Sequence, residues 1–63
     1  MNLKVGDIIL AYNPESFGWI KCKVNRIRKS LITLEYIEGS LKGIIRYEII
    51  GRLKNPDYYR MAK

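Results

Sequence analysis

The sequence predicts an all-β domain, a small five-stranded antiparallel barrel with strongly bent strands. Three observations lead to this prediction. The apolar residues are mostly Ile, Leu, Val and Tyr, which favour strands. Turn-forming residues interrupt the apolar runs about every 8–12 residues, which is typical of sandwiches and barrels. The chain has 63 residues, a length that suits one domain of about five strands. We therefore expect one domain over 1–63, with the barrel at about 4–53 and a tail at 54–63.

The first strand is expected over Ile8–Tyr12, directly after a Gly6-Asp7 turn. The segment that follows, 13–16, reads Asn-Pro-Glu-Ser. Proline and asparagine are strong turn formers, so this segment is expected to be a loop that reverses the chain.

The second strand is expected to be the longest, from Trp19 to about Lys29. Apolar and basic residues alternate along it, so one face would be buried and the other would display lysines. The alternation shifts near Asn25-Arg26, which predicts a β-bulge that bends the strand. Cys22 falls on the apolar face, and we expect a small buried residue rather than a reactive thiol.

Two shorter strands follow the second one. Leu31–Ile37 is expected to be the third strand, with its even-numbered residues facing inward. A turn is expected at 38–40, where Gly39 accommodates a positive φ at little cost. The fourth strand is then expected over Leu41–Tyr47.

The C-terminal part allows two interpretations. Residues 48–53 predict a short fifth element or a helical turn. The segment 55–57, Asn-Pro-Asp, resembles a helix start, with asparagine at the N-cap and proline at the first helical position. We therefore predict one or two helical turns over 56–61.

The charge of the chain indicates an anionic partner. Twelve Lys and Arg oppose six Asp and Glu, which gives a net charge of +6 on a small surface. Such a balance is typical of nucleic-acid binding proteins. The simpler alternative is that these residues form the solvated outer face of a strand. The basic candidates are expected on the second strand, at its end or on a neighbouring strand: Lys21, Lys23, Arg26 and Arg28, then Lys29, then Lys42 and Arg46.

The composition argues against an enzyme. The chain has no histidine and one cysteine, so common zinc sites, histidine-based catalysis and an internal disulfide are not expected. No phosphate-binding or dinucleotide-binding motif is present. We expect no catalytic residue, metal or cofactor. We also expect no signal peptide and no membrane span, and a cytoplasmic location, or a nuclear one in a eukaryote.

Four segments together resemble the Tudor family of small barrels of the Src-homology-3 type. They are the Gly-Asp step and strand GDIILAY (6–12), the Gly-Trp step and basic strand GWIKCKVNRI (18–27), the strand LITLEY (31–36), and the final strand and turn GIIRYEIIGRL (43–53). The resemblance covers most of the chain. It implies a barrel that acts as a binding module.

Tudor domains that read methyl groups hold methylated Lys or Arg in a cage of aromatic rings, through cation–π attraction. The resemblance places Tyr12 and Tyr36 at cage positions. It also places Ile20 and Gly39 where the family has aromatic residues, so half of the cage is absent. The aromatic candidates for base stacking or for a partial cage are Tyr12, Trp19, Tyr36 and Tyr47.

The sequence thus predicts a non-enzymatic module that binds nucleic acid, DNA or RNA, through a basic strand face with low sequence specificity. The alternative is an adaptor or regulator that docks on an acidic or methylated protein. A further possibility is a homo-oligomer formed through an exposed strand edge, because partly open barrels leave such an edge unpaired. A monomer stays equally open at this point.

Overall fold

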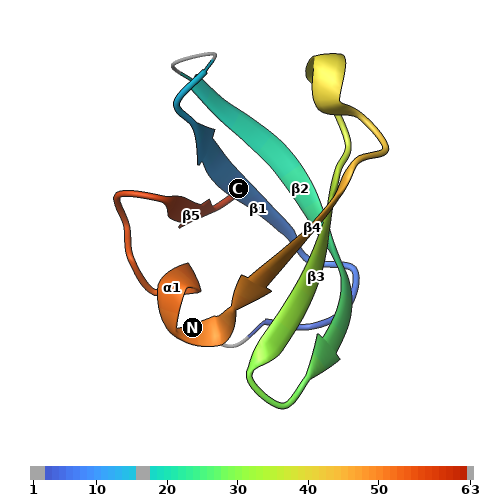
Figure 1. Ribbon diagram of the computed structural model, residues 1–63, viewed down its shortest axis with the longest axis vertical. Coiled ribbons are helices and arrows are strands. Elements are labelled where there is room, and N and C mark those ends of the chain that lie inside the picture. The colour runs from blue at the N-terminus through green and yellow to red at the C-terminus, as the bar shows by residue number, and fades with distance from the viewer. Residues whose placement is uncertain (1–2, 16–17, 63) are drawn as a thin grey trace.

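The computed structural model describes residues 3–15 and 18–62. Its strands form one antiparallel sheet in the order β4-β3-β2-β1-β5. Figure 1 shows β2 as the longest strand, with the shorter strands arranged around it. The elements are β1 (Ile8–Asn13), β2 (Gly18–Arg28), β3 (Leu31–Tyr36), the 3-10 turn η1 (Gly39–Leu41), β4 (Ile45–Ile49), α1 (Ile50–Leu53) and β5 (Tyr59–Met61). The predicted all-β class with five strands is confirmed.

The sheet is open where β4 and β5 form its two edges. These strands pair with β3 and β1 respectively, and the described residues form no backbone ladder between them. Side chains span this seam instead, because the Tyr59 hydroxyl of β5 donates a hydrogen bond of 2.6 Å to Glu48 Oε2 of β4. The structure therefore establishes a five-stranded antiparallel sheet.

The predicted bulge lies in β2. Val24 pairs with Leu34 of β3, and the next pair is Arg26 with Thr33, which leaves Asn25 as the extra residue. A bulge adds one residue to one strand and bends it. Beyond the bulge, the apolar side chain of β2 again faces inward and the basic ones outward. The prediction of a bulge at this position is confirmed.

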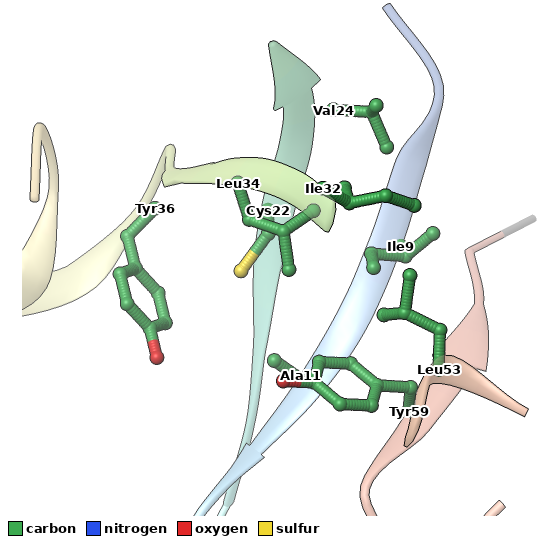
Figure 2. Packing of buried hydrophobic residues seen from close by; sticks show 9 residues of the cluster. All are labelled: Ile9, Ala11, Cys22, Val24, Ile32, Leu34, Tyr36, Leu53 and Tyr59. Carbon is green, nitrogen blue, oxygen red and sulfur yellow. The ribbon is translucent and has the colours of Figure 1, made fainter. Parts of the chain in front are cut away.

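The core lies on the concave inner face of the sheet, the face that carries the buried side chains. Figure 2 shows these side chains converging from β1, β2, β3, α1 and β5. The buried cluster consists of Ile9, Ala11, Cys22, Val24, Ile32, Leu34, Tyr36, Leu53 and Tyr59. The prediction that Cys22 is a buried core residue is confirmed.

The fourth strand begins later than predicted, at Ile45 instead of Leu41. The chain first makes the η1 turn, in which the Lys42 N–H donates to the Gly39 carbonyl. Gly43 then adopts a positive φ of 91°, a conformation that a strand does not contain. The prediction for 41–47 was wrong at its N-terminal half because turn geometry here outweighs the apolar pattern.

The prediction of one or two helical turns over 56–61 is wrong beyond a single turn. Asn55 begins that turn as predicted: its side chain accepts a hydrogen bond of 2.9 Å from the Asp57 N–H, and its carbonyl accepts from the Tyr58 and Tyr59 N–H groups. The chain then enters β5, where Tyr59 pairs with Ala11 and Met61 pairs with Ile9 of β1. Pairing with β1 and burial of Tyr59 outweigh the weak tendency of so short a segment to form a helix.

The helical alternative for 48–53 is confirmed in part, because α1 covers Ile50–Leu53 while Glu48 and Ile49 end β4. None of the helices in the described part of the chain is long and apolar enough to cross a membrane. The predicted loop at 13–16 ends at Ser16, which lies outside the described residues, as does Lys63 at the end of the predicted tail.

We expect Gly43→Ala to lower the free energy of unfolding by about 1 kcal/mol, because an alanine is strained at positive φ. Gly51→Ala is the matched control. Gly51 lies in α1 without a positive φ, and a Cβ there meets no atom within 4 Å. This control should be neutral or raise stability by about 0.5 kcal/mol. Urea denaturation of both variants tests the pair, and equal effects would contradict the prediction.

Candidate nucleic-acid interface

Four basic side chains follow one another along the outer face of β2. Outward-facing positions alternate with the buried residues Cys22 and Val24, as expected for a strand with one face in the core. The bulge restores this alternation in the second half of the strand. We call this set the basic face; its members are the exposed residues Lys21, Lys23, Arg26 and Arg28.

Two carboxylates adjoin the basic face, and Oε1 of one of them, Glu38, accepts a hydrogen bond of 2.9 Å from the Lys21 backbone N–H. Glu35 of β3 is the cross-strand neighbour of Lys23, and its Oε1 accepts a hydrogen bond of 2.8 Å from Asn25 Nδ2. Both ion pairs found within residues 3–15 and 18–62 end on Glu48, which lies on the inner side of the sheet. None of the four cations of the basic face is in an ion pair among these residues, which leaves them available to an external anion.

An aromatic corner lies beside the start of the basic face. Trp19 of β2 and Tyr12 of β1 are cross-strand partners whose rings meet edge to face, with centroids 5.5 Å apart. The Arg60 guanidinium of β5 lies 4.3 Å from the centroid of the Trp19 ring. Arg60 thus adds a fifth cation close to the basic face, next to an aromatic surface.

Lys29 and Lys42 lie in connections between elements and are exposed. Lys29 follows Arg28 directly and adopts a φ of 49° in the turn to β3, so it extends the basic face. Lys42 lies in the connection between η1 and β4, off the sheet.

Arg46 lies apart from the other predicted cations. It pairs with buried Leu34 and therefore faces the inner side of the sheet. Its Nη1 donates to the Tyr36 hydroxyl at 3.0 Å, and its Nη2 lies 3.6 Å from Glu48 Oε2. The structure therefore does not bring Arg46 to the basic face, and the expected position on a strand next to β2 is wrong, because β3 lies between β4 and β2.

The four predicted aromatic candidates do not form one cluster. Tyr12 and Trp19 lie together, whereas Tyr36 is buried on the inner face. Tyr47 is 67% exposed on the outer face of the edge strand β4. A methyl-binding cage needs several rings around one cation. The aromatic corner offers only two, those of Tyr12 and Trp19.

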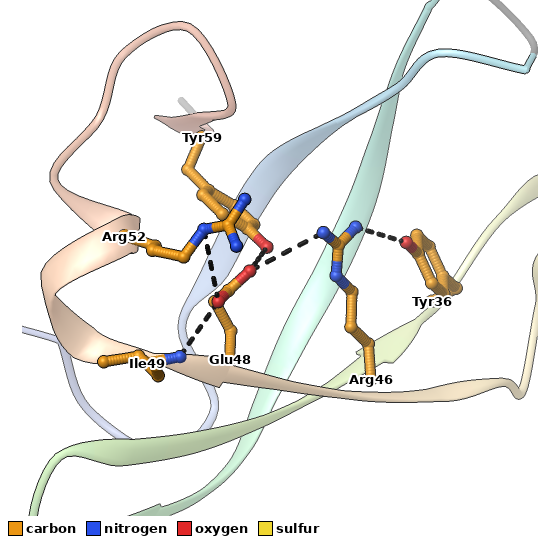
Figure 3. A network of polar contacts seen from close by, with 6 residues as sticks. All are labelled: Tyr36, Arg46, Glu48, Ile49, Arg52 and Tyr59. Atoms are coloured by element: carbon orange, nitrogen blue, oxygen red, sulfur yellow. Dashed lines mark hydrogen bonds and ion pairs between the residues drawn. The ribbon is translucent and has the colours of Figure 1, made fainter.

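A polar network closes the seam between β4 and β5. Figure 3 shows Glu48 at its centre, with dashed lines to Tyr59, Arg46, Arg52 and the backbone of Ile49. Burial alone would raise the pKa of the Glu48 carboxyl. The hydrogen bonds from Tyr59 and Ile49 and the two nearby arginines outweigh burial and lower this pKa below its usual value. Burial and the bond to Glu48 raise the pKa of Tyr59.

The single cysteine of the chain, Cys22, is buried. Burial raises the pKa of the Cys22 thiol to about 11, so this thiol is protonated at neutral pH and is a poor nucleophile. No three His, Cys, Asp or Glu side chains gather in the described part of the chain in a way that could hold a metal ion.

Two contributions to this site were missed at the sequence level. Arg60 was assigned to a helical tail, and nothing in the local sequence links it to Trp19, which is distant along the chain. The seam network was missed for the same reason, because it depends on the position of β5.

No family model matches the chain, and none of the curated proteins or solved structures does either.

Proposed function

We propose that this protein is a non-enzymatic module that binds nucleic acid through the basic face of β2. The observation that carries the proposal is the set of four exposed cations on one strand face, none of which is in an ion pair among the described residues. Outward side chains of one strand follow each other at roughly 7 Å. Such a row of Lys and Arg is suited to contact successive phosphates, which supplies most of the affinity of non-specific binding.

The aromatic corner supports a preference for single strands. Trp19 and Tyr12 present ring surface beside Lys21, and base stacking on aromatic rings tolerates any sequence. Arg60 already lies over Trp19, so a base would stack on the guanidinium plane or displace it. Contacts to phosphates position a ligand without reading its sequence, and we therefore propose low sequence specificity.

We further propose that the sheet is a barrel of the Tudor type. Two observations support this finer assignment. The bulge at Asn25 bends β2, and bent strands are needed to close a small barrel. The hydrogen bond between Tyr59 and Glu48 joins the edge strands where the backbone ladder is missing.

The alternative, docking on an acidic or methylated protein, would use the same cations and the same aromatic corner. The position of Arg60 disfavours the methylated ligand, because this cation of the chain itself already occupies the face of the Trp19 ring. An acidic peptide remains a useful competitor in the experiment below.

The test is a titration of labelled single-stranded DNA, single-stranded RNA and duplex DNA with the protein at several salt concentrations. If four cations contact phosphates, log K should fall with log[salt] with a slope of about −2.8 for single strands and about −3.6 for duplex DNA. An acidic peptide and a methyl-lysine peptide, added in parallel, should compete weakly. Absent or salt-insensitive binding would overturn the proposal, and tighter binding to a peptide would favour the alternative.

A further inference from the structure

The edge strand β4 has backbone groups that are free to pair. Its ladder with β3 uses alternate residues, because the Tyr36 N–H donates to the Ile44 carbonyl and the Ile50 N–H donates to the Ser30 carbonyl at the two ends. In an antiparallel pair, the residues between these positions direct their N–H and C=O groups away from the partner. In β4 these residues are Ile45, Tyr47 and Ile49. Of the N–H groups of these three residues, that of Ile49 is already bonded: it donates to Glu48 Oε1 at 3.0 Å.

The same three residues place large apolar side chains on the outer face. Ile45 is 43% exposed, Tyr47 67% and Ile49 55%. Leu31 of β3, the cross-strand neighbour of Ile49, extends this apolar strip. An exposed apolar edge strand is a template for pairing with another strand. Its position, two strands away from β2, separates it from the basic face.

The residue order of β4, Ile-Arg-Tyr-Glu-Ile, identifies the strand that fits this edge. We propose that β4 pairs antiparallel with β4 of a second copy of this chain, centred on Tyr47. This register places Ile45 opposite Ile49 of the second copy, and Tyr47 opposite its own equivalent. The outer faces of the two strands are therefore complementary, whereas Arg46 and Glu48 face the inner side and stay paired within their own chain. Apolar pairs directly across a ladder stabilise it.

The hydrogen bonds of this register agree with the free groups of β4. The two copies of Tyr47 exchange a pair of backbone bonds across the two-fold axis. Each Ile45 N–H donates to the Ile49 carbonyl of the other copy, which adds two more. The Ile49 N–H is already bonded to Glu48 and is not used in this register.

The dimer is expected to be weak and favoured by salt. A standard interface buries about 800 Å² on each partner, and the outer strip of one five-residue strand offers less. Each copy carries a charge of +6, and salt screens the repulsion between copies. Binding of nucleic acid should weaken as salt rises, so the two activities respond to salt in opposite directions. The dimer would also carry two basic faces, one in each copy.

Sedimentation equilibrium of the full chain at about 20 μM to 1 mM, in 0.1 and 0.5 M NaCl, tests the proposal. We expect reversible dimers that are more populated at 0.5 M NaCl. A chain that stays monomeric at 1 mM in both salts would overturn the proposal, whatever the outcome of the nucleic-acid titration.

The register is tested by two variants of the central residue. Y47K alone and Y47E alone should each dimerise at least about tenfold more weakly than the natural chain, because each puts like charges opposite each other and removes the apolar ring. An equimolar mixture of the two should regain the dimer as a mixed pair. Y58K, which changes another exposed tyrosine outside β4, is the control and should dimerise as the natural chain does. A mixture as monomeric as its components would show that the register is wrong.

Discussion

Replacing Glu48 by glutamine is expected to lower the free energy of unfolding by about 2–4 kcal/mol. Glu48 is 7% exposed and accepts bonds from the Tyr59 hydroxyl and the Ile49 N–H, with Arg46 and Arg52 close by. Removing one charge from a buried, hydrogen-bonded pair leaves its partners with unsatisfied groups, and this loss is costly. The stability of a 63-residue domain is roughly 3–9 kcal/mol, so the expected loss is a large share of the total.

Urea denaturation measures this loss, with E15Q as the control, because Glu15 is exposed and lies in the loop after β1. The control should change stability by less than about 0.5 kcal/mol. A loss for E48Q as small as that of E15Q would mean that the seam network contributes nothing to the fold.

The free energy of unfolding at acid pH should also depend on the Glu48 carboxylate. The folded pKa of Glu48 lies below its usual value of 4.5, so the unfolded chain takes up this proton at a higher pH than the folded chain does. The stabilisation is complete above about pH 5 and is lost as pH falls through the folded pKa. The difference in stability between the natural chain and E48Q should therefore shrink as pH falls below about 5. A constant difference would contradict this assignment.

The sheet could be predicted from the sequence because it depends on local patterns. Alternating apolar residues predicted β1, β2 and β3 nearly as they are, and the shift of that alternation at Asn25 predicted the bulge. β5 could not be predicted in this way. Its three residues are held by β1, which is distant in sequence, and by the burial of Tyr59. The helix-start pattern at Asn55 is a local signal that this tertiary pairing outweighs.

The site was predictable to the extent that it follows strand alternation. The cations of the basic face lie on one side of β2 because every second residue does. Arg46 has the same chemistry but faces inward, since its position in β4 is fixed by the register with Leu34. Alternation gives the relative orientation of residues within one strand, and only the register between strands decides which cations share a face.

Neutralising two cations of the basic face should reduce affinity at 0.1 M salt by about 60-fold for duplex DNA and by about 25-fold for single strands. The variant is K21Q/R26Q, whose side chains lie on the outer face of β2 and are exposed. Each phosphate that the protein no longer neutralises keeps its counterions, and their release contributes roughly a factor of eight per phosphate for duplex DNA and roughly five for single strands at this salt concentration. The slope of log K against log[salt] should become shallower by about 1.8 for duplex DNA and by about 1.4 for single strands.

The control, K4Q/K54Q, removes the same charge elsewhere. Lys4 and Lys54 are exposed and line a hollow floored by Ile27 and Ile32, two inward-facing residues of β2 and β3. If affinity depended on net charge alone, both double variants would lose it equally and show the same slope. If the basic face is the binding surface, K4Q/K54Q should bind within about threefold of the natural chain, because screened charges on the other side of the sheet contribute little. The ratio between the two variants therefore separates a defined interface from the general attraction of a basic protein for a polyanion.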